Sequence, residues 1–168
     1  YGFMKWNDYD FDLWQKVREE ALENRTEFEY GIFGRDVSPK NIRMSDKNVE
    51  QAGLKGKVTL KRQAFESQKA PEGDVKGVLI TNPPYDERME EKNLDEVYAM
   101  MGNRLKQHFE GYDAWIISSN MEGLKNVGLK TSRKIALMNG SLECKFQKYE
   151  LYKGSKRKTD EEVEELEK

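Results

Sequence analysis

The chain has 168 residues, the length of one ordinary domain. Charged residues make up 36% of the chain and hydrophobic residues another 36%. Three Trp, eight Tyr and seven Phe are available to anchor a core, which excludes a fully disordered chain. Lys and Arg number 29 against 31 Asp and Glu, so bulk charge does not indicate nucleic-acid binding. One Cys and one His exclude an internal disulfide framework and a structural zinc site.

No apolar run approaches the length of a membrane span and no signal peptide opens the chain, so the sequence predicts a cytoplasmic protein without a membrane partner. The opening "YGFMKW" lacks an initiator Met, and we interpret the chain as a fragment of a longer protein. The closing "GSKRKTDEEVEELEK" has almost no apolar side chains, which is typical either of a solvated, disordered tail or of a frayed helix. We therefore predict one domain over residues 1–153 and a charged tail over 154–168.

Segments with helical spacing of apolar residues alternate with runs rich in β-branched and aromatic residues. In one predicted helix, Ser38 suits the N-cap, Pro39 the first helical position and Gly53 the position after the last turn. Near the end of the chain, Asn139-Gly140 is a strong hairpin signal. Helices are predicted over residues 8–24, 38–53, 94–111 and 121–129, and strands over 27–37, 57–65, 77–84 and 113–120, with two more strands within 132–153.

This alternation indicates an α/β fold with a largely parallel sheet, to which the final hairpin adds an antiparallel strand. The strands over 77–84 and 113–120 are apolar on both faces, as expected of central strands. Ligands of such sheets bind at the carboxyl ends of the strands. Three strand ends are therefore candidates for a site: Asp36, Gln63 and Asn82.

Asp36 stands at the end of a predicted strand and before a predicted helix. A carboxylate in this position commonly binds both ribose hydroxyls of a nucleoside cofactor, because it can accept two hydrogen bonds. The alternative is that Asp36 caps the following turn. Position alone leaves both interpretations open.

The stretch "TNPPYDERM" places an amide, two prolines and an aromatic ring directly after a strand. Pro83 and Pro84 fix φ, remove two backbone donors and push Asn82 into an extended conformation. The Asn82 Oδ1 and the Pro83 carbonyl can then accept both N–H groups of an exocyclic amine on a flat base and aim its lone pair at an electrophile. Tyr85 can stack on that base, a contact worth about 1–3 kcal/mol. The alternative is a rigid strand-to-loop turn with a surface tyrosine.

"TNPPYDERM" resembles the catalytic motif of S-adenosylmethionine-dependent amino methyltransferases. Its longer form, N-P-P-Y followed by an acidic-Arg-apolar triplet, resembles the guanine-N2 methyltransferases of 23S ribosomal RNA, the large THUMP-containing type often labelled N6-adenine DNA methylases. Only the acidic tail lies outside the resemblance. Further segments that carry it are "YGFMKW" with "DLWQKV", "GRDVSPKNIRMSDKNVEQAGL", "FEGYDAWIISSN" and "NGSLECKFQKYELY".

The resemblance implies a Rossmann-like fold and methyl transfer from S-adenosyl-L-methionine to the N2 amine of guanine in large-subunit ribosomal RNA, with no metal. It also implies that Asp36 binds the cofactor ribose. The catalytic residues that it implies are Asn82, Pro83, Pro84 and Tyr85. The cofactor-binding residues that it implies are Asp36, Val37, Gln63, Ala64 and Asn82.

Two departures from the family pattern carry expectations of their own. The family has a glycine-rich loop, D-P-x-C-G-S-G, on a first strand upstream of "YGFMKW", and this loop has no counterpart here. We therefore expect the sheet to lack its first strand. We also expect the chain alone to bind cofactor poorly and to have little activity. Gln63 stands where many relatives have an acid that helps to hold the adenine. The alternative functions are an N6-adenine-specific DNA methyltransferase, which shares N-P-P-Y, and a non-catalytic, methyltransferase-like RNA-binding module.

A few other ionisable or reactive side chains have separate predictions. His108, near a helix end, is predicted to be a cap or surface residue and not a catalytic base. Cys144 falls in a strand and is predicted to be buried and inert. Glu87 and Arg88 either pair with each other or shape the target pocket.

Overall fold

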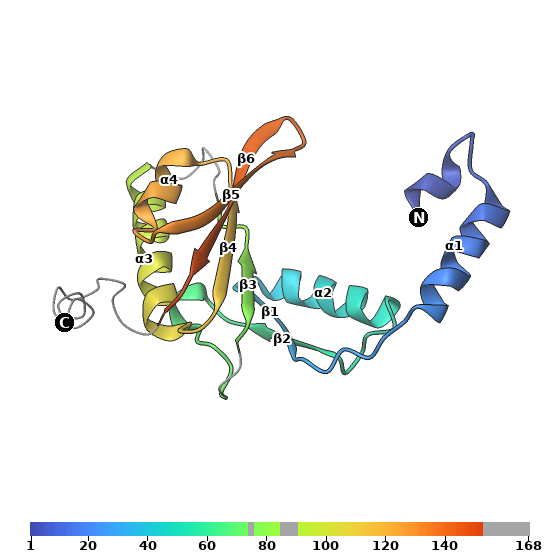
Figure 1. Ribbon diagram of the computed structural model, residues 1–168, viewed down its shortest axis with the longest axis horizontal. Coiled ribbons are helices and arrows are strands. Elements are labelled where there is room, and N and C mark those ends of the chain that lie inside the picture. Colours follow the sequence, from blue (N-terminus) through green and yellow to red (C-terminus); the bar gives the residue numbers. More distant parts are fainter. Residues whose placement is uncertain (74–75, 85–90, 153–168) are drawn as a thin grey trace, which may run out of the picture.

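The computed structural model describes residues 1–73, 76–84 and 91–152. Helices and strands alternate along most of this length, as the sequence predicts (Figure 1). The strands are β1 (Ile32–Asp36), β2 (Val58–Arg62), β3 (Val78–Thr81), β4 (Asp113–Ser118), β5 (Thr131–Asn139) and β6 (Leu142–Glu150). The α-helices are α1 (Phe11–Glu23), α2 (Pro39–Gln51), α3 (Glu91–His108) and α4 (Met121–Asn126), with 3₁₀ turns at Gly2–Lys5 and Phe65–Ser67.

The strands form two sheets, where the sequence predicted one. β1 and β2 pair in parallel, with Asp36 opposite Arg62 at the last register position. The second sheet has the order β3-β4-β6-β5; β3 and β4 are parallel, and β6 runs antiparallel to both of its neighbours. The fold is therefore α/β and Rossmann-like, with the predicted antiparallel hairpin at its end.

The prediction of a central position for β3 is wrong for the described sheets. β3 is the edge strand of its sheet, because it pairs only with β4 among the described residues. Val78 is 62% exposed and Ile80 is 67% exposed on one face of this strand. β4 does lie centrally, with Ala114 and Ile116 fully buried on the face toward the core. The apolar pattern of β3 thus identifies a strand suited to burial on both faces, although only β4 pairs with it among the described residues.

The hydrophobic core lies where α3 and α4 cover one face of the four-stranded sheet (Figure 1). Tyr98 and Leu105 of α3 are fully buried there, against Ile116 of β4 and Tyr149 of β6. A side chain at Gly102 would overlap the Val127 carbonyl oxygen, so this glycine allows the turn after α4 to approach α3 closely. Apart from Pro83, every buried residue in the described part of the chain belongs to the segment 94–151.

The helix ends follow local sequence signals. Ser38 Oγ accepts a hydrogen bond from Asn41 N at 3.3 Å, Pro39 opens α2, and Gly53 has φ +69° after the helix, all as predicted. The hairpin also follows its signal, since β5 ends at Asn139 and Gly140 has φ +62°. β1 is shorter than predicted and begins at Ile32.

α1 lies at the far end of the structure from the four-stranded sheet (Figure 1). Asp10 caps it by accepting a hydrogen bond from Leu13 N at 2.9 Å. The helix contains no buried residue, and Leu13 on its apolar face is 57% exposed. None of the helices described is both long enough and apolar enough to cross a lipid bilayer.

Candidate functional site

Asp36 is half-buried at the carboxyl end of β1, where its carboxylate faces the start of α2. Its Oδ1 accepts a hydrogen bond from Ser38 N at 2.7 Å, and its Oδ2 accepts one from Asn41 Nδ2 at 3.0 Å. The residue therefore does cap the turn that follows β1. A carboxylate has about four lone-pair positions. Two remain for a ligand, so the capping contacts orient the group and leave it able to accept two ribose hydroxyls.

An open cavity of about 310 Å³ lies beside Asp36, at the ends of β1 and β2. It is lined by Val37, Arg62, Gln63 and Ala64. Val37 is 62% exposed, although it is an apolar residue at a strand end. An apolar wall next to a fixed carboxylate suits a flat ring joined to a sugar, and three of the predicted cofactor-binding residues are among the four that line this cavity.

Gln63 holds the two strand ends together and leaves one acceptor available. Its backbone N–H donates to the Asp36 carbonyl at 3.0 Å, and its Nε2 donates to the Ser67 carbonyl at 2.9 Å. Because the amide nitrogen is bound in this way, Oε1 is the free end of the side chain among the described contacts. An acceptor at this position can bind an exocyclic amine, which is the task that an acidic side chain would also perform.

Asn82, Pro83 and Pro84 follow directly after β3 on the other sheet. Pro83 is buried, whereas Asn82 and Pro84 are exposed. A buried ring between two exposed residues anchors the turn, so the Asn82 side chain projects from a fixed backbone. Tyr85, Glu87 and Arg88 lie outside the described residues.

The two groups of predicted residues stand at the carboxyl ends of parallel strands in separate sheets. Asp36 belongs to the β1-β2 pair, whereas Asn82 follows β3 of the four-stranded sheet. Carboxyl ends of parallel strands are where ligands of α/β folds bind. The structure brings three of the five predicted cofactor-binding residues, Val37, Gln63 and Ala64, together around one cavity beside Asp36. The fifth, Asn82, lies with the amine-binding candidates on a separate turn.

Cys144 and His108 were also singled out from the sequence, and the structure describes both. Cys144 is fully buried in β6, as predicted. His108 is the last residue of α3, and its carbonyl accepts a hydrogen bond from Ala70 N at 2.9 Å. Within the described ranges, no group of three His, Cys, Asp or Glu side chains is arranged to hold a metal ion.

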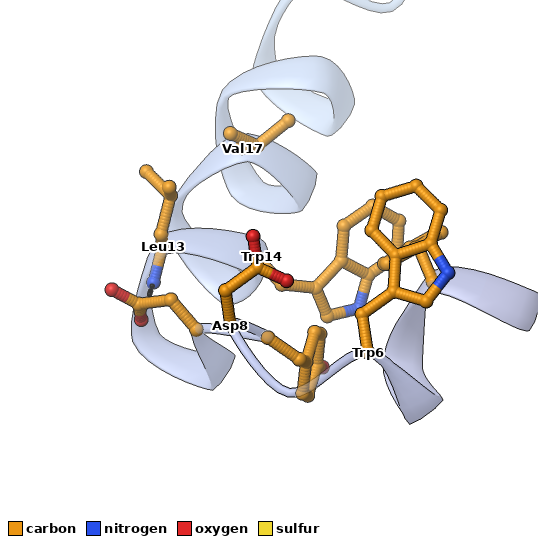
Figure 2. A pocket seen from close by; sticks show the side chains of 8 residues that line it. Trp6, Asp8, Leu13, Trp14 and Val17 are labelled. Atoms are coloured by element: carbon orange, nitrogen blue, oxygen red, sulfur yellow. Dashed lines mark hydrogen bonds between the residues drawn. The ribbon is translucent and has the colours of Figure 1, made fainter.

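A second cavity, of about 350 Å³, lies between the N-terminal turn and α1 (Figure 2). Trp6, Leu13, Trp14 and Val17 give it an apolar lining, and Asp8 stands at the same cavity. Phe3 packs edge-on against Trp14 with ring centroids 5.0 Å apart. The sequence indicated the helix but not this cavity, whose lining includes none of the predicted site residues.

Arg62 is a lining residue that the sequence reasoning missed. It is the last residue of β2, and its Nε donates to the Val37 carbonyl at 3.0 Å. The signal available in the sequence was its place directly before Gln63, at a strand end already identified as a candidate. Through this hydrogen bond its guanidinium connects the end of β2 to the residue that follows β1.

Comparisons with known proteins show which family this chain belongs to. The family model described as "RMKL-like, methyltransferase domain" matches residues 2–148. The ribosomal RNA large subunit methyltransferase K/L of Methylococcus capsulatus is 33% identical over 151 residues, which cover 87% of this chain and 20% of that protein. The protein of the same name from Allochromatium vinosum is 34% identical over 155 residues, 90% of this chain and 21% of the relative.

Solved structures show the same likeness. The crystal structure of SMU.472 complexed with SAH (S-adenosylhomocysteine) has a TM-score of 0.75 and 28% identity, covering 92% of this chain and 41% of that chain. The crystal structure of "a possible methylase" from Clostridium difficile 630 has a TM-score of 0.72 and 28% identity, with the same coverage of both chains. The chain thus spans about a fifth of the two relatives and 41% of each of the two solved chains.

Proposed function

Because the chain belongs to the RMKL-like methyltransferase domain family, we propose that it forms part of an enzyme that transfers a methyl group from S-adenosyl-L-methionine to the N2 amine of guanine in 23S ribosomal RNA. The observation that carries this proposal is the anchored Asn82-Pro83-Pro84 turn at the carboxyl end of β3. The names of the ribosomal RNA methyltransferases among its relatives support the choice of RNA.

The residues around Asp36 fit the nucleoside half of this cofactor. The carboxylate retains acceptor positions for two ribose hydroxyls, and Val37 and Ala64 offer apolar surface to an adenine ring. The free Oε1 of Gln63 is a suitable acceptor for the adenine amine. When bound, the cofactor supplies a methyl group on a sulfonium, which is a good leaving group.

The turn after β3 provides the groups that hold the target amine. The Asn82 Oδ1 and the Pro83 carbonyl accept one N–H each, which favours a more pyramidal nitrogen and directs its lone pair toward the methyl donor. The buried Pro83 ring fixes both acceptors before the substrate arrives, so the contribution to the rate is one of positioning. Tyr85, directly after this turn, is proposed to stack on the base.

The described residues provide contacts for the nucleoside half of the cofactor and for the target amine. The family's glycine-rich loop, which approaches the methionine half, has no counterpart in this sequence.

The direct test is methylation of ribosomal RNA that lacks its modifications by the complete gene product, with the modified base identified by mass. The proposal predicts N2-methylguanine. Modification of adenine in DNA would favour the N6-adenine alternative, and the absence of any transfer would favour the non-catalytic RNA-binding module.

Asn82→Ala in the complete protein tests the role of the turn. We expect the rate of methyl transfer to fall by about 100-fold or more, because one of two fixed acceptors for the amine is lost, while cofactor affinity stays nearly unchanged. Asn103→Ala, at an exposed asparagine of α3, is the matched control and should leave the rate unchanged. A large loss of cofactor binding in Asn82→Ala would contradict the assignment.

A further inference from the structure

One peptide unit at the end of β1 is held at both of its polar ends. The carbonyl of Val37 accepts a hydrogen bond from Arg62 Nε at 3.0 Å. The N–H of the same peptide unit, that of Ser38, donates to Asp36 Oδ1 at 2.7 Å. A guanidinium and a carboxylate are thus joined through a single amide.

The register of the β1-β2 pair brings this contact about. Asp36 and Arg62 are opposite each other at the last position of the parallel pair, yet no ion pair joins them directly in the described part of the structure. The Arg62 side chain is exposed and reaches past Asp36 to the next carbonyl. The Val37–Ser38 peptide therefore lies between the two charged groups.

The physical effect of this arrangement falls on Asp36. A positive charge at the carbonyl end of an amide polarises the amide and makes its N–H a stronger donor. That N–H binds the Oδ1 of Asp36, while Asn41 binds the Oδ2 at 3.0 Å. Each carboxylate oxygen is consequently fixed by one donor, and Arg62 strengthens one of these two contacts.

We propose that Arg62 is a positioning residue for the ribose site, acting through the Val37–Ser38 peptide to hold the Asp36 carboxylate toward the two ribose hydroxyls. The inference rests on the proposed function, because it takes Asp36 as the ribose ligand. It assigns a role to a residue that lies in the wall of the cavity and does not itself have to contact the sugar.

The chain offers a matched set of variants for the test. Arg62→Met removes the donor and the charge, whereas Arg62→Gln places a neutral N–H the same number of bonds from Cα as Arg Nε. Lys61→Met, at the preceding exposed position whose side chain points to the other face of β2, is the control. Adenosine and 2′,3′-dideoxyadenosine, titrated into the ¹⁵N-labelled chain and followed by NMR, report the affinity with and without the ribose hydroxyls.

The expected result is a change in the ratio of the two affinities. The unaltered chain and Lys61→Met should prefer adenosine over the dideoxy compound, and Arg62→Met should reduce that preference roughly five-fold, the loss of about one hydrogen bond. Arg62→Gln, which keeps the donor without the charge, should restore only part of it, and the Ser38 amide proton should shift upfield most in Arg62→Met. A merely structural role would weaken both ligands equally and leave the ratio unchanged.

The outcomes separate this inference from the proposed function. An unchanged affinity ratio in Arg62→Met, with adenosine still bound by the unaltered chain, would overturn the role of Arg62 and leave the ribose site standing. An unaltered chain that binds adenosine and the dideoxy compound equally would contradict the ribose site at Asp36, and the inference with it.

Discussion

The two sheets of this chain differ sharply in how they are packed. The four-stranded sheet with α3 and α4 contains the hydrophobic core, whereas β1, β2 and α2 contain no buried residue. Yet the cavity and the predicted ribose ligand belong to the sparsely packed pair. The segment that carries most of the predicted cofactor-binding residues therefore has the least burial to stabilise it.

This difference has an energetic consequence. Burial of apolar surface is the main favourable contribution to folding, so local stability should be high around β4 and low around β1. The hydrogen bonds of Asp36 and Gln63 order the end of β1, but each contributes only about 1 kcal/mol. A ligand that binds both strand ends would therefore stabilise the weaker sheet most.

The largest expected effect comes from two apolar side chains in helices of the two regions. Leu105→Ala in α3 should lower the free energy of unfolding by about 3 kcal/mol, because the residue is fully buried and its loss leaves a cavity. Met44→Ala in α2 should cost less than about 1 kcal/mol, because that side chain is 54% exposed. Urea denaturation of both variants measures the difference, and equal losses would remove the distinction between the regions.

A smaller effect is expected at Gly102 of α3, where this helix meets the turn after α4. Gly102→Ala should destabilise the chain by about 2 kcal/mol, because the added methyl group overlaps the Val127 carbonyl. In an open helix the same substitution would stabilise slightly. Gly2→Ala is the control, because the added Cβ meets no atom within 4 Å, and it should leave the urea midpoint unchanged. If Gly102→Ala also left the free energy of unfolding unchanged, α3 and the turn after α4 would not be in close contact.

The smallest effect concerns the buried tyrosine of β6. Burial raises the pKa of Tyr149 to about 12, with a lowering contribution from Thr131. The unfolded chain releases this proton near pH 10, so the contribution to stability is complete below pH 10 and is lost as the pH rises toward 12. Tyr149→Phe should remove that part of the pH dependence, and should cost about 1 kcal/mol at neutral pH through the lost hydrogen bond to Gln147.

Denaturation of Tyr149→Phe between pH 8 and pH 12 checks this expectation. Tyr30→Phe, at a tyrosine that is 68% exposed, is the matched control. A stability curve for Tyr149→Phe that falls with pH as steeply as that of the unaltered chain would assign the alkaline loss to another group.

Local signals in the sequence predicted local structure well. Ser38, Pro39 and Gly53 mark the ends of α2 because capping and positive φ depend on neighbouring residues alone. The turn at Asn139-Gly140 follows for the same reason. The division into two sheets did not follow, because periodicity reports which residues suit burial and not which strands are neighbours.

The candidate site could be predicted in part. The rule that ligands bind at the carboxyl ends of parallel strands identified Asp36 and Gln63. The structure places both beside one cavity, and their roles stay predictions. Arg62 was missed because its contact with the Val37 carbonyl depends on the register of two strands, which no local pattern encodes. For Asn82, the sequence predicted the stiff turn, and the structure adds the buried Pro83 that anchors it.

Amide hydrogen exchange tests most directly the claim that packing and ribose chemistry lie in different parts of the chain. We predict that amides of α3, β4 and β6 exchange slowest and that those of β1, β2 and α2 exchange much faster. Saturating adenosine should slow exchange chiefly at β1 and Ser38. Equal protection of the two sheets without ligand, or adenosine-dependent protection confined to the four-stranded sheet, would contradict it.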